Sequence, residues 1–196
     1  MNTRYRITQT LLNSWLYVYK TDSGWEDFLA TLHRQSKPKT KAMLDGIHFE
    51  NIINACLDGQ ALDMSLEWAE SISQLLPVLD GSQKQVAIFK DFTVDGVTFV
   101  LHGVLDFLKA GVIFDTKFSK TYKVDKYLES PQHPMYFELV PEAYEFQYLI
   151  CDGKYVYKET YRPDEVEPIE VKIRQFMNFL DRENLVDTFY SLWKTN

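Results

Sequence analysis

The segment that most constrains the fold covers residues 103–117, with the sequence G-V-L-D-F-L-K-A-G-V-I-F-D-T-K. Two apolar, β-type runs flank Lys109-Ala110-Gly111, which predicts a tight turn and therefore an antiparallel hairpin. In such a hairpin, Asp106 lies opposite a position between Ile113 and Asp115. The chain is thus expected to build a sheet around this hairpin.

The hairpin is expected to bring three charged side chains to one place. Asp115 and Lys117 are two positions apart on one strand, so they project from the same face. Burying these two groups together with Asp106 among apolar residues is costly unless a cation or a partner compensates their charges. Convergent carboxylates provide hard oxygen ligands for Mg²⁺ or Mn²⁺, and a neighbouring lysine can orient a phosphate or an attacking water.

Two further motifs lie on either side of the hairpin. Gly46-Ile47-His48-Phe49-Glu50 precedes it, and Gln132-His133-Pro134-Met135-Tyr136 follows it. Taken in order, G-x-x-x-E, G-x-x-D, D-x-K and Q-x-x-x-Y resemble the PD-(D/E)XK nuclease superfamily, in particular its RecB-like and lambda-exonuclease-like branch. The resemblance covers about residues 46–150.

The resemblance implies a deoxyribonuclease that depends on Mg²⁺ or Mn²⁺. Asp106 and Asp115 would bind the metal directly, and the carbonyl of Thr116 would supply a further oxygen. Glu50 would complete the metal shell directly or through water; a solvent-facing glutamate is the alternative. Lys117 would position the nucleophile and offset the charge of the transition state.

Four more side chains are expected to contact DNA. Gln132 and Tyr136 are four residues apart, so they are neighbours on one helix face. The resemblance implies that this pair binds a phosphate or a flipped nucleotide, whereas an amphipathic helix with Tyr136 partly in the core is the alternative. Lys120 and Lys123 are placed for phosphate contacts only.

The pattern of the whole chain predicts a mixed α/β fold. Helical periodicity covers residues 8–20, 25–34, 41–57, 63–76, a short segment from 130 that ends before Pro141, and 165–193; strand patterns cover 85–94, 97–108, 111–119, 144–150 and 155–161. The α-β-β-β-α-β order matches the core of the resembled superfamily. We therefore expect a mixed β-sheet nuclease core flanked by helices, in one compact domain: residues 1–40 form a helical N-terminal extension, and residues 41–196 form the core with a C-terminal helix.

Composition predicts a cytoplasmic protein, in the host cytoplasm if the gene belongs to a phage. No apolar run approaches a membrane span, so no membrane partner is expected. Cys56 and Cys151 are too few for a disulfide framework or for the four-cysteine iron–sulfur cluster of some RecB-like nucleases. The net charge of −7 argues against a simple DNA-binding module, but two basic segments, at residues 34–41 and 117–126, adjoin the candidate site.

We predict an end-dependent exonuclease that acts on duplex DNA ends. The resemblance implies a role in phage or bacterial DNA recombination or repair. Fraying a nucleotide costs less at a terminus than inside a duplex, and no base-reading helix is evident. The alternatives are a structure- or sequence-directed endonuclease of the same fold, a catalytically weak DNA-binding recombination accessory protein, and a metal enzyme with another substrate. A homo-oligomer and a single-strand annealing or recombination partner protein are compatible with all of the nucleic-acid alternatives.

Overall fold

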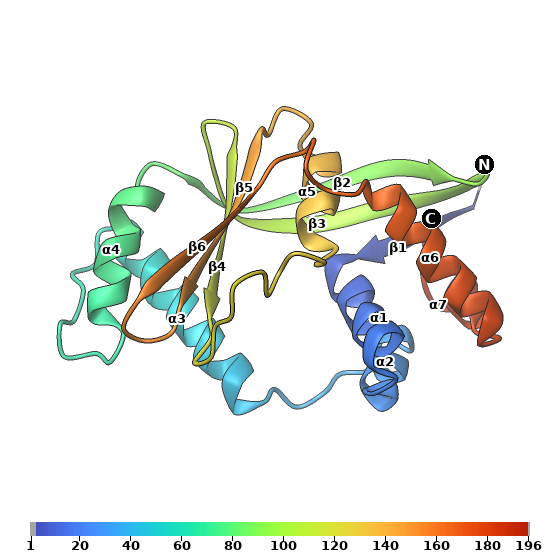
Figure 1. The fold of residues 1–196 in the computed structure, drawn as a ribbon, viewed down its shortest axis with the longest axis horizontal. Helices are drawn as coiled ribbons and strands as arrows, with labels where there is room; N and C mark the ends of the chain where they lie inside the picture. The colour runs from blue at the N-terminus through green and yellow to red at the C-terminus, as the bar shows by residue number, and fades with distance from the viewer. Residues whose placement is uncertain (1–2, 196) are drawn as a thin grey trace.

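The structure, a computed structural model, describes residues 3–195 and confirms the mixed α/β fold (Figure 1). Seven helices are present in these residues: α1 Gln9–Thr21, α2 Trp25–Leu32, α3 Lys41–Leu57, α4 Ala69–Leu79, α5 Gln132–Leu139, α6 Ile169–Arg182 and α7 Val186–Leu192. The strands are β1 Arg4–Thr8, β2 Gln83–Val94, β3 Val97–Lys109, β4 Val112–Phe118, β5 Glu145–Cys151, β6 Val156–Tyr161 and β7 Lys194–Thr195. No helix within the described residues is both long and apolar enough to cross a membrane.

The seven strands form one mixed sheet in the order β6-β5-β4-β3-β1-β7, and β2 pairs with the other edge of β3. The β1–β3 and β4–β5 pairs are parallel, and the remaining pairs are antiparallel. The predicted tight turn at residues 109–111 is confirmed, and a second turn of the same kind joins β2 to β3 at residues 95–96. Ala110 and Gly111 have φ of 48° and 79°, and Asp95 and Gly96 have φ of 50° and 81°, as two-residue turns of this hand require.

The sheet splits along one edge of β3. On this edge, β1 pairs with residues 98–102 and β4 pairs with residues 107–109, which leaves residues 103–106 without a strand partner. Helix α5 lies at this gap, where the Tyr136 hydroxyl donates a hydrogen bond of 2.7 Å to the Val104 carbonyl. At the other end of the gap, the Asp106 carboxylate accepts a hydrogen bond of 3.2 Å from the Thr116 amide. The split therefore places Asp106 beside Asp115 and Thr116, the first residues of β4 that no longer pair with β3.

Gly103 allows α5 to approach β3 this closely. A Cβ atom at this position would lie 2.6 Å from the Tyr136 ring and 2.7 Å from the Leu139 side chain. Both distances are shorter than van der Waals contact, so a side chain at residue 103 would push α5 out of the gap. The first residue of the G-x-x-D motif thus has a packing role.

Two apolar clusters hold the helices against the sheet. The larger includes buried side chains of α1, α5 and α6, such as Trp15, Met135 and Phe176. The smaller joins α3 and α4 to β3, β4 and β5 through Phe49, Ile53, Ile72, Leu75, Leu79, Phe107, Phe114, Leu149 and Cys151. The candidate site lies between these two packed regions, at the split of the sheet.

Three details of the predicted secondary structure are corrected. Helix α4 begins at Ala69, later than predicted, and runs through Pro77 because this proline lies in the last turn, where the Asp80 amide still bonds the Leu76 carbonyl at 2.9 Å. The predicted C-terminal helix is two helices, because Asn184 adopts a left-handed φ of 58° between them. Strands β1 and β7 were not predicted, so the helical N-terminal region begins with a strand of the central sheet.

Candidate functional site

The centre of the site is an ion pair at the split of the sheet. Lys117 Nζ lies 2.6 Å from Asp115 Oδ2, and the Asp115 side chain is 2% exposed. Gln132, the first residue of α5, donates a hydrogen bond from its amide to Asp115 Oδ1. Asp106 faces the same β4 strand through its bond to the Thr116 amide. The structure thus brings together residues from G-x-x-D, D-x-K and Q-x-x-x-Y.

The charges of this group act strongly on one another. Burial raises the pKa of Asp106 well above its usual range; the Asp115 and Glu50 carboxylates add to the rise, and Lys117 opposes it. Burial would lower the pKa of Lys117, but the neighbouring carboxylates Asp115 and Asp106 outweigh it, so the net shift is upward. Lys117 is therefore held as an ammonium among carboxylates. We call Glu50, Asp106, Asp115 and Lys117 the carboxylate–lysine cluster.

Glu50 joins the cluster from helix α3. Phe49 and Ile53 are buried against the sheet, and this packing fixes the side of α3 that carries Glu50. Burial raises the pKa of Glu50 and nearby Asp115 adds to the rise, whereas the hydrogen bond from Gln85 and the charge of Lys117 lower it. Glu50 thus lies close enough to Asp115 and Lys117 for their charges to shift its pKa, and its place in a metal shell stays a prediction.

Gln85 of β2 is a site residue that the sequence did not indicate. Its amide donates a hydrogen bond of 2.6 Å to Glu50 Oε1. Its backbone has a left-handed φ of 51°, unusual for a non-glycine residue inside a strand. Gln85 fixes one oxygen of Glu50. The sequence carries no local signal for this contact, which joins residues 35 positions apart.

Gly46 does not have the role expected for it. A glycine inside a helix costs about 1 kcal/mol relative to alanine, which predicts that another backbone passes close to it. A Cβ atom at Gly46 would meet nothing within 4 Å, so this expectation is wrong. His48, two residues further along α3, is exposed.

The type of donor atom at this site suits a hard divalent cation, but the present arrangement of these atoms does not form a metal site. Three carboxylates offer oxygen ligands, and their mutual repulsion is what Mg²⁺ or Mn²⁺ would relieve. Asp115 Oδ2 is buried with no partner in hydrogen-bond geometry, although the Lys117 ammonium is its neighbour. Across residues 3–195, however, no three histidine, cysteine or acidic side chains form a ready metal cage. A cation at this site would require Asp115 to exchange one of its present contacts.

The remaining predicted residues occupy different environments. Gln132 and Tyr136 are both buried, and the Tyr136 hydroxyl is bonded to the Val104 carbonyl, so Tyr136 supports β3 and does not face a cavity. Thr116 is buried, and its Oγ1 atom has no hydrogen-bond partner. Lys120 and Lys123 are exposed in the connection between β4 and α5. Their contact with DNA stays a prediction.

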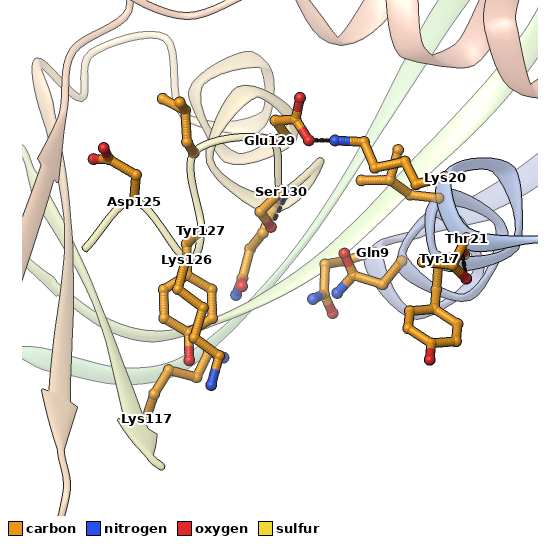
Figure 2. Close-up of a pocket in the computed structure, with 14 residues that line it drawn as sticks. Gln9, Tyr17, Lys20, Thr21, Lys117, Asp125, Lys126, Tyr127, Glu129 and Ser130 are labelled. Atoms are coloured by element: carbon orange, nitrogen blue, oxygen red, sulfur yellow. Dashed lines mark hydrogen bonds and ion pairs between the residues drawn. The ribbon is translucent and has the colours of Figure 1, made fainter. Parts of the chain in front are cut away.

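A polar cavity of about 440 Å³ opens beside the cluster (Figure 2). Its lining residues come from α1, from the end of β4, and from the connection into α5: Gln9, Asn13, Leu16, Tyr17, Lys20, Thr21, Lys117, Asp125, Lys126, Tyr127, Leu128, Glu129, Ser130 and Gln132. Figure 2 shows Lys117 and Tyr127 on one side and Gln9 and Tyr17 on the other, with the Lys20–Glu129 ion pair bridging them. The cluster thus borders a space rich in amide, hydroxyl and ammonium groups.

A buried carboxylate holds one wall of this cavity. Glu159 of β6 accepts hydrogen bonds from the Tyr122 hydroxyl at 2.8 Å and from the backbone amides of Lys126 and Tyr127 at 3.1 and 3.3 Å. The Tyr161 hydroxyl donates a fourth bond of 2.7 Å. Four donors satisfy the buried charge and fix the wall of the cavity beside Lys117.

His133 makes the stability of the protein sensitive to acid. Its ring is buried and stacks on Tyr161, with centroids 4.1 Å apart, and burial lowers its pKa to about 3. The folded protein therefore keeps His133 neutral below pH 6.5, where the unfolded chain takes up a proton. Stability is complete above the unfolded pKa and falls as pH drops toward the folded pKa.

We expect the free energy of unfolding to fall by about 2 kcal/mol from pH 7.5 to pH 5.0, because the unfolded chain binds a proton at His133 and the folded protein does not. Urea denaturation of the wild type and of His133→Phe at both pH values measures it. The difference between the two pH values should be smaller in the variant by this amount, because phenylalanine keeps the stack on Tyr161 and cannot be protonated. Equal pH dependence of the two proteins would contradict the assignment.

Comparisons with known proteins give the fold only. No protein-family model matches the chain, and no curated protein matches it. Among solved structures, the crystal structure of SSO0001 is similar, with a TM-score of 0.57 and 12% sequence identity. The similarity covers 94% of this chain and 79% of that chain. At this identity, the likeness shows a shared fold and carries no statement about activity.

Proposed function

We propose that the protein is a metal-dependent deoxyribonuclease of the cytoplasm that hydrolyses phosphodiester bonds, most simply as an end-dependent exonuclease. The observation that carries the proposal is the Lys117 ammonium, 2.6 Å from the buried Asp115 carboxylate, with Asp106 and Glu50 near enough to shift one another's pKa. An ammonium among three carboxylates, open to a polar cavity, matches the chemistry of phosphate-ester hydrolysis.

Each member of the cluster has a distinct role in this proposal. Asp106, Asp115 and Glu50, with the Thr116 carbonyl, would hold Mg²⁺ or Mn²⁺. The bound cation would supply Lewis-acid activation of water and neutralise phosphate charge. Lys117 stays protonated because of its neighbours, so it can orient the nucleophile and stabilise the negative charge that develops on the phosphate.

The cavity beside the cluster favours action at ends. A space of about 440 Å³ is in the range of pockets that hold one small ligand, so it suits a single frayed nucleotide better than a duplex. Freeing one nucleotide from its partner costs a few kcal/mol inside a duplex and less at a terminus. Gln9 and Asn13 of α1 and Lys126 on the opposite wall would contact that nucleotide.

A second function is supported by the contacts of Asp115. Both of its oxygens are engaged, by Gln132 and by Lys117, and the described residues form no ready metal cage. This arrangement favours a catalytically weak DNA-binding accessory protein over a structure- or sequence-directed endonuclease. The two functions differ in one measurable outcome, which is strand cleavage.

Incubation with linear and covalently closed duplex DNA, with Mg²⁺, with Mn²⁺ and with EDTA, tests the proposal. We expect linear DNA to be degraded only with a divalent cation and closed circles to be spared. Cutting of closed circles at an equal rate, or into discrete fragments, would replace the exonuclease with an endonuclease. Binding of DNA without cleavage in either metal would instead support the accessory protein.

A further inference from the structure

Three cations meet in a second cavity, at the β1–β7 edge of the sheet. Arg6, Arg34 and Lys194 line a space of about 280 Å³ together with Trp193 and Thr195. None of these lining residues is acidic, so like charges share a small volume without a carboxylate among them. The positive charge of this cavity is complementary to that of an anion.

Arg34 is held in place by a backbone carbonyl and an aromatic ring, and one nitrogen of Arg6 lacks an acceptor within residues 3–195. Arg34 donates a hydrogen bond of 3.2 Å to the Leu192 carbonyl and lies 5.4 Å above the Trp193 ring. Arg6 Nε is buried with no hydrogen-bond partner among the described residues. A buried, unpaired donor is costly and uncommon. An anion in the cavity would satisfy it and separate the three positive charges.

One face of strand β3 runs from the cavity toward the candidate site. Arg6 is aligned with Val100 of β3, and side chains two positions apart along β3 lead from Val100 to Asp106 on one face. On this face, Phe89 of β2 stacks on His102 with centroids 4.2 Å apart and remains 56% exposed. The Arg6 guanidinium lies 5.9 Å from the Phe89 ring. An exposed aromatic ring beside cations is typical of surfaces that contact nucleic acid.

The spacing suits a DNA backbone. Val100 and Asp106 are six residues apart on β3, which corresponds to about 20 Å at the rise of a strand. Base pairs of duplex DNA recur about every 3.4 Å along the axis, so this distance equals about six base pairs, which is more than half of a helical turn. The phosphate of the complementary strand, rather than that of the cleaved strand, then faces the sheet at this distance.

We propose that the cavity of Arg6, Arg34 and Lys194 binds a backbone phosphate of the DNA substrate, on the complementary strand and about six base pairs along the duplex from the bond that is cleaved. The proposal rests on the proposed function for the substrate, and on the cavity itself for the site. Arginine forks match phosphate oxygens in two parallel hydrogen bonds, and the lysine adds charge. The Phe89–His102 stack lies along the route between the two sites.

The test compares two variants that each remove two positive charges. Arg34→Gln/Lys194→Gln changes the cavity, and Arg182→Gln/Lys109→Gln changes cations outside it. Affinity for a 30-base-pair duplex is measured by fluorescence anisotropy in EDTA over a range of salt concentrations. We expect the cavity variant to bind about tenfold more weakly, with the slope of log K against log salt reduced by about 1. The control variant should keep the wild-type slope.

Substrate length gives a second readout. With metal present, a DNA hairpin with a stem of four base pairs is too short to reach the cavity, so wild type and cavity variant should degrade it equally, whereas a long duplex should show a raised KM in the variant. If the double variant does not fold, Lys194→Gln alone continues the test, because this side chain is exposed.

The outcomes separate this proposal from the proposed nuclease activity. Equal salt slopes for wild type and cavity variant would overturn the phosphate site and leave cleavage untouched. DNA binding without cleavage, with the slope reduced only in the cavity variant, would support the site and count against the nuclease. A melting temperature that inorganic phosphate raises in the wild type only, with unchanged DNA slopes, would identify a site for small anions and overturn the DNA-binding proposal.

Discussion

Lys117→Met is expected to lower the rate of DNA cleavage by at least two to three orders of magnitude, the loss seen when one preorganised charge-stabilising donor is removed. Methionine keeps most of the length of the side chain but carries no charge. The loss should appear in kcat rather than in KM, because Lys117 acts on charge that develops in the transition state. Single-turnover cleavage of linear duplex at saturating protein measures it directly.

The stability of the same variant provides a second check. Without the ammonium 2.6 Å away, the buried Asp115 carboxylate loses its counter-ion, and the raised pKa values of Asp106 and Glu50 should rise further. Mg²⁺ or Mn²⁺ should therefore raise the melting temperature of Lys117→Met at least as much as that of the wild type. Lys120→Ala, which changes an exposed lysine three residues later, is the matched control and should cleave at close to the wild-type rate. Full cleavage by Lys117→Met, in a preparation free of contaminating nuclease, would remove Lys117 from the mechanism.

The parts of the site that the sequence predicted depend on turns and caps formed by residues close together in the chain. The tight turn at residues 109–111 needs left-handed backbone, and the sequence places Ala110 and Gly111 there. Once the turn is fixed, the register pairs Phe107 with Phe114, where the β3–β4 pairing ends, and Asp106 lies just beyond it, bonded to the Thr116 amide. The Thr8 side chain accepts a hydrogen bond from the Leu11 amide at the start of α1, and a threonine directly before an apolar helical repeat is a local signal of this kind.

The parts that the sequence did not predict depend on contacts between distant segments. Strand β1 pairs with a strand more than 90 residues later, and the cap at its last residue, Thr8, indicates only the start of α1 and not a strand before it. Gln85 reaches Glu50 only because an irregular backbone in β2 meets a helix from elsewhere in the chain. Neither contact has a local signal.

The basic segment at residues 34–41 shows why charge counts along a sequence mislead. Lys37 lies 2.5 Å from Asp27, and Lys41 lies 3.1 Å from Asp45. Arg34 instead lines the cavity at the β1–β7 edge, far along the sequence from the residues it meets. The segment adjoins the site in sequence, but two of its charges are paired with carboxylates and a third lines a different cavity.

Gly103→Ala is expected to destabilise the fold and to lower activity together, because the site depends on the packing of α5 in the split of the sheet. A Cβ atom would lie 2.6 Å from the Tyr136 ring, which cannot move aside freely while its hydroxyl is bonded to the Val104 carbonyl. Relief of the clash requires α5 to shift, and Gln132 at its start would then leave Asp115. Overpacking of this kind costs about 1–3 kcal/mol.

Gly46→Ala is the matched substitution for Gly103→Ala, because the same methyl group meets nothing within 4 Å at Gly46. Alanine in the middle of α3 should stabilise the protein by about 1 kcal/mol through helix propensity alone. Urea denaturation of both variants and cleavage of linear duplex measure the two effects. We expect opposite signs in stability and a loss of cleavage in Gly103→Ala only. A Gly103→Ala protein as stable and as active as the wild type would show that α5 can leave the gap without disturbing Asp115, and the role of the split sheet in holding the carboxylate–lysine cluster would then be wrong.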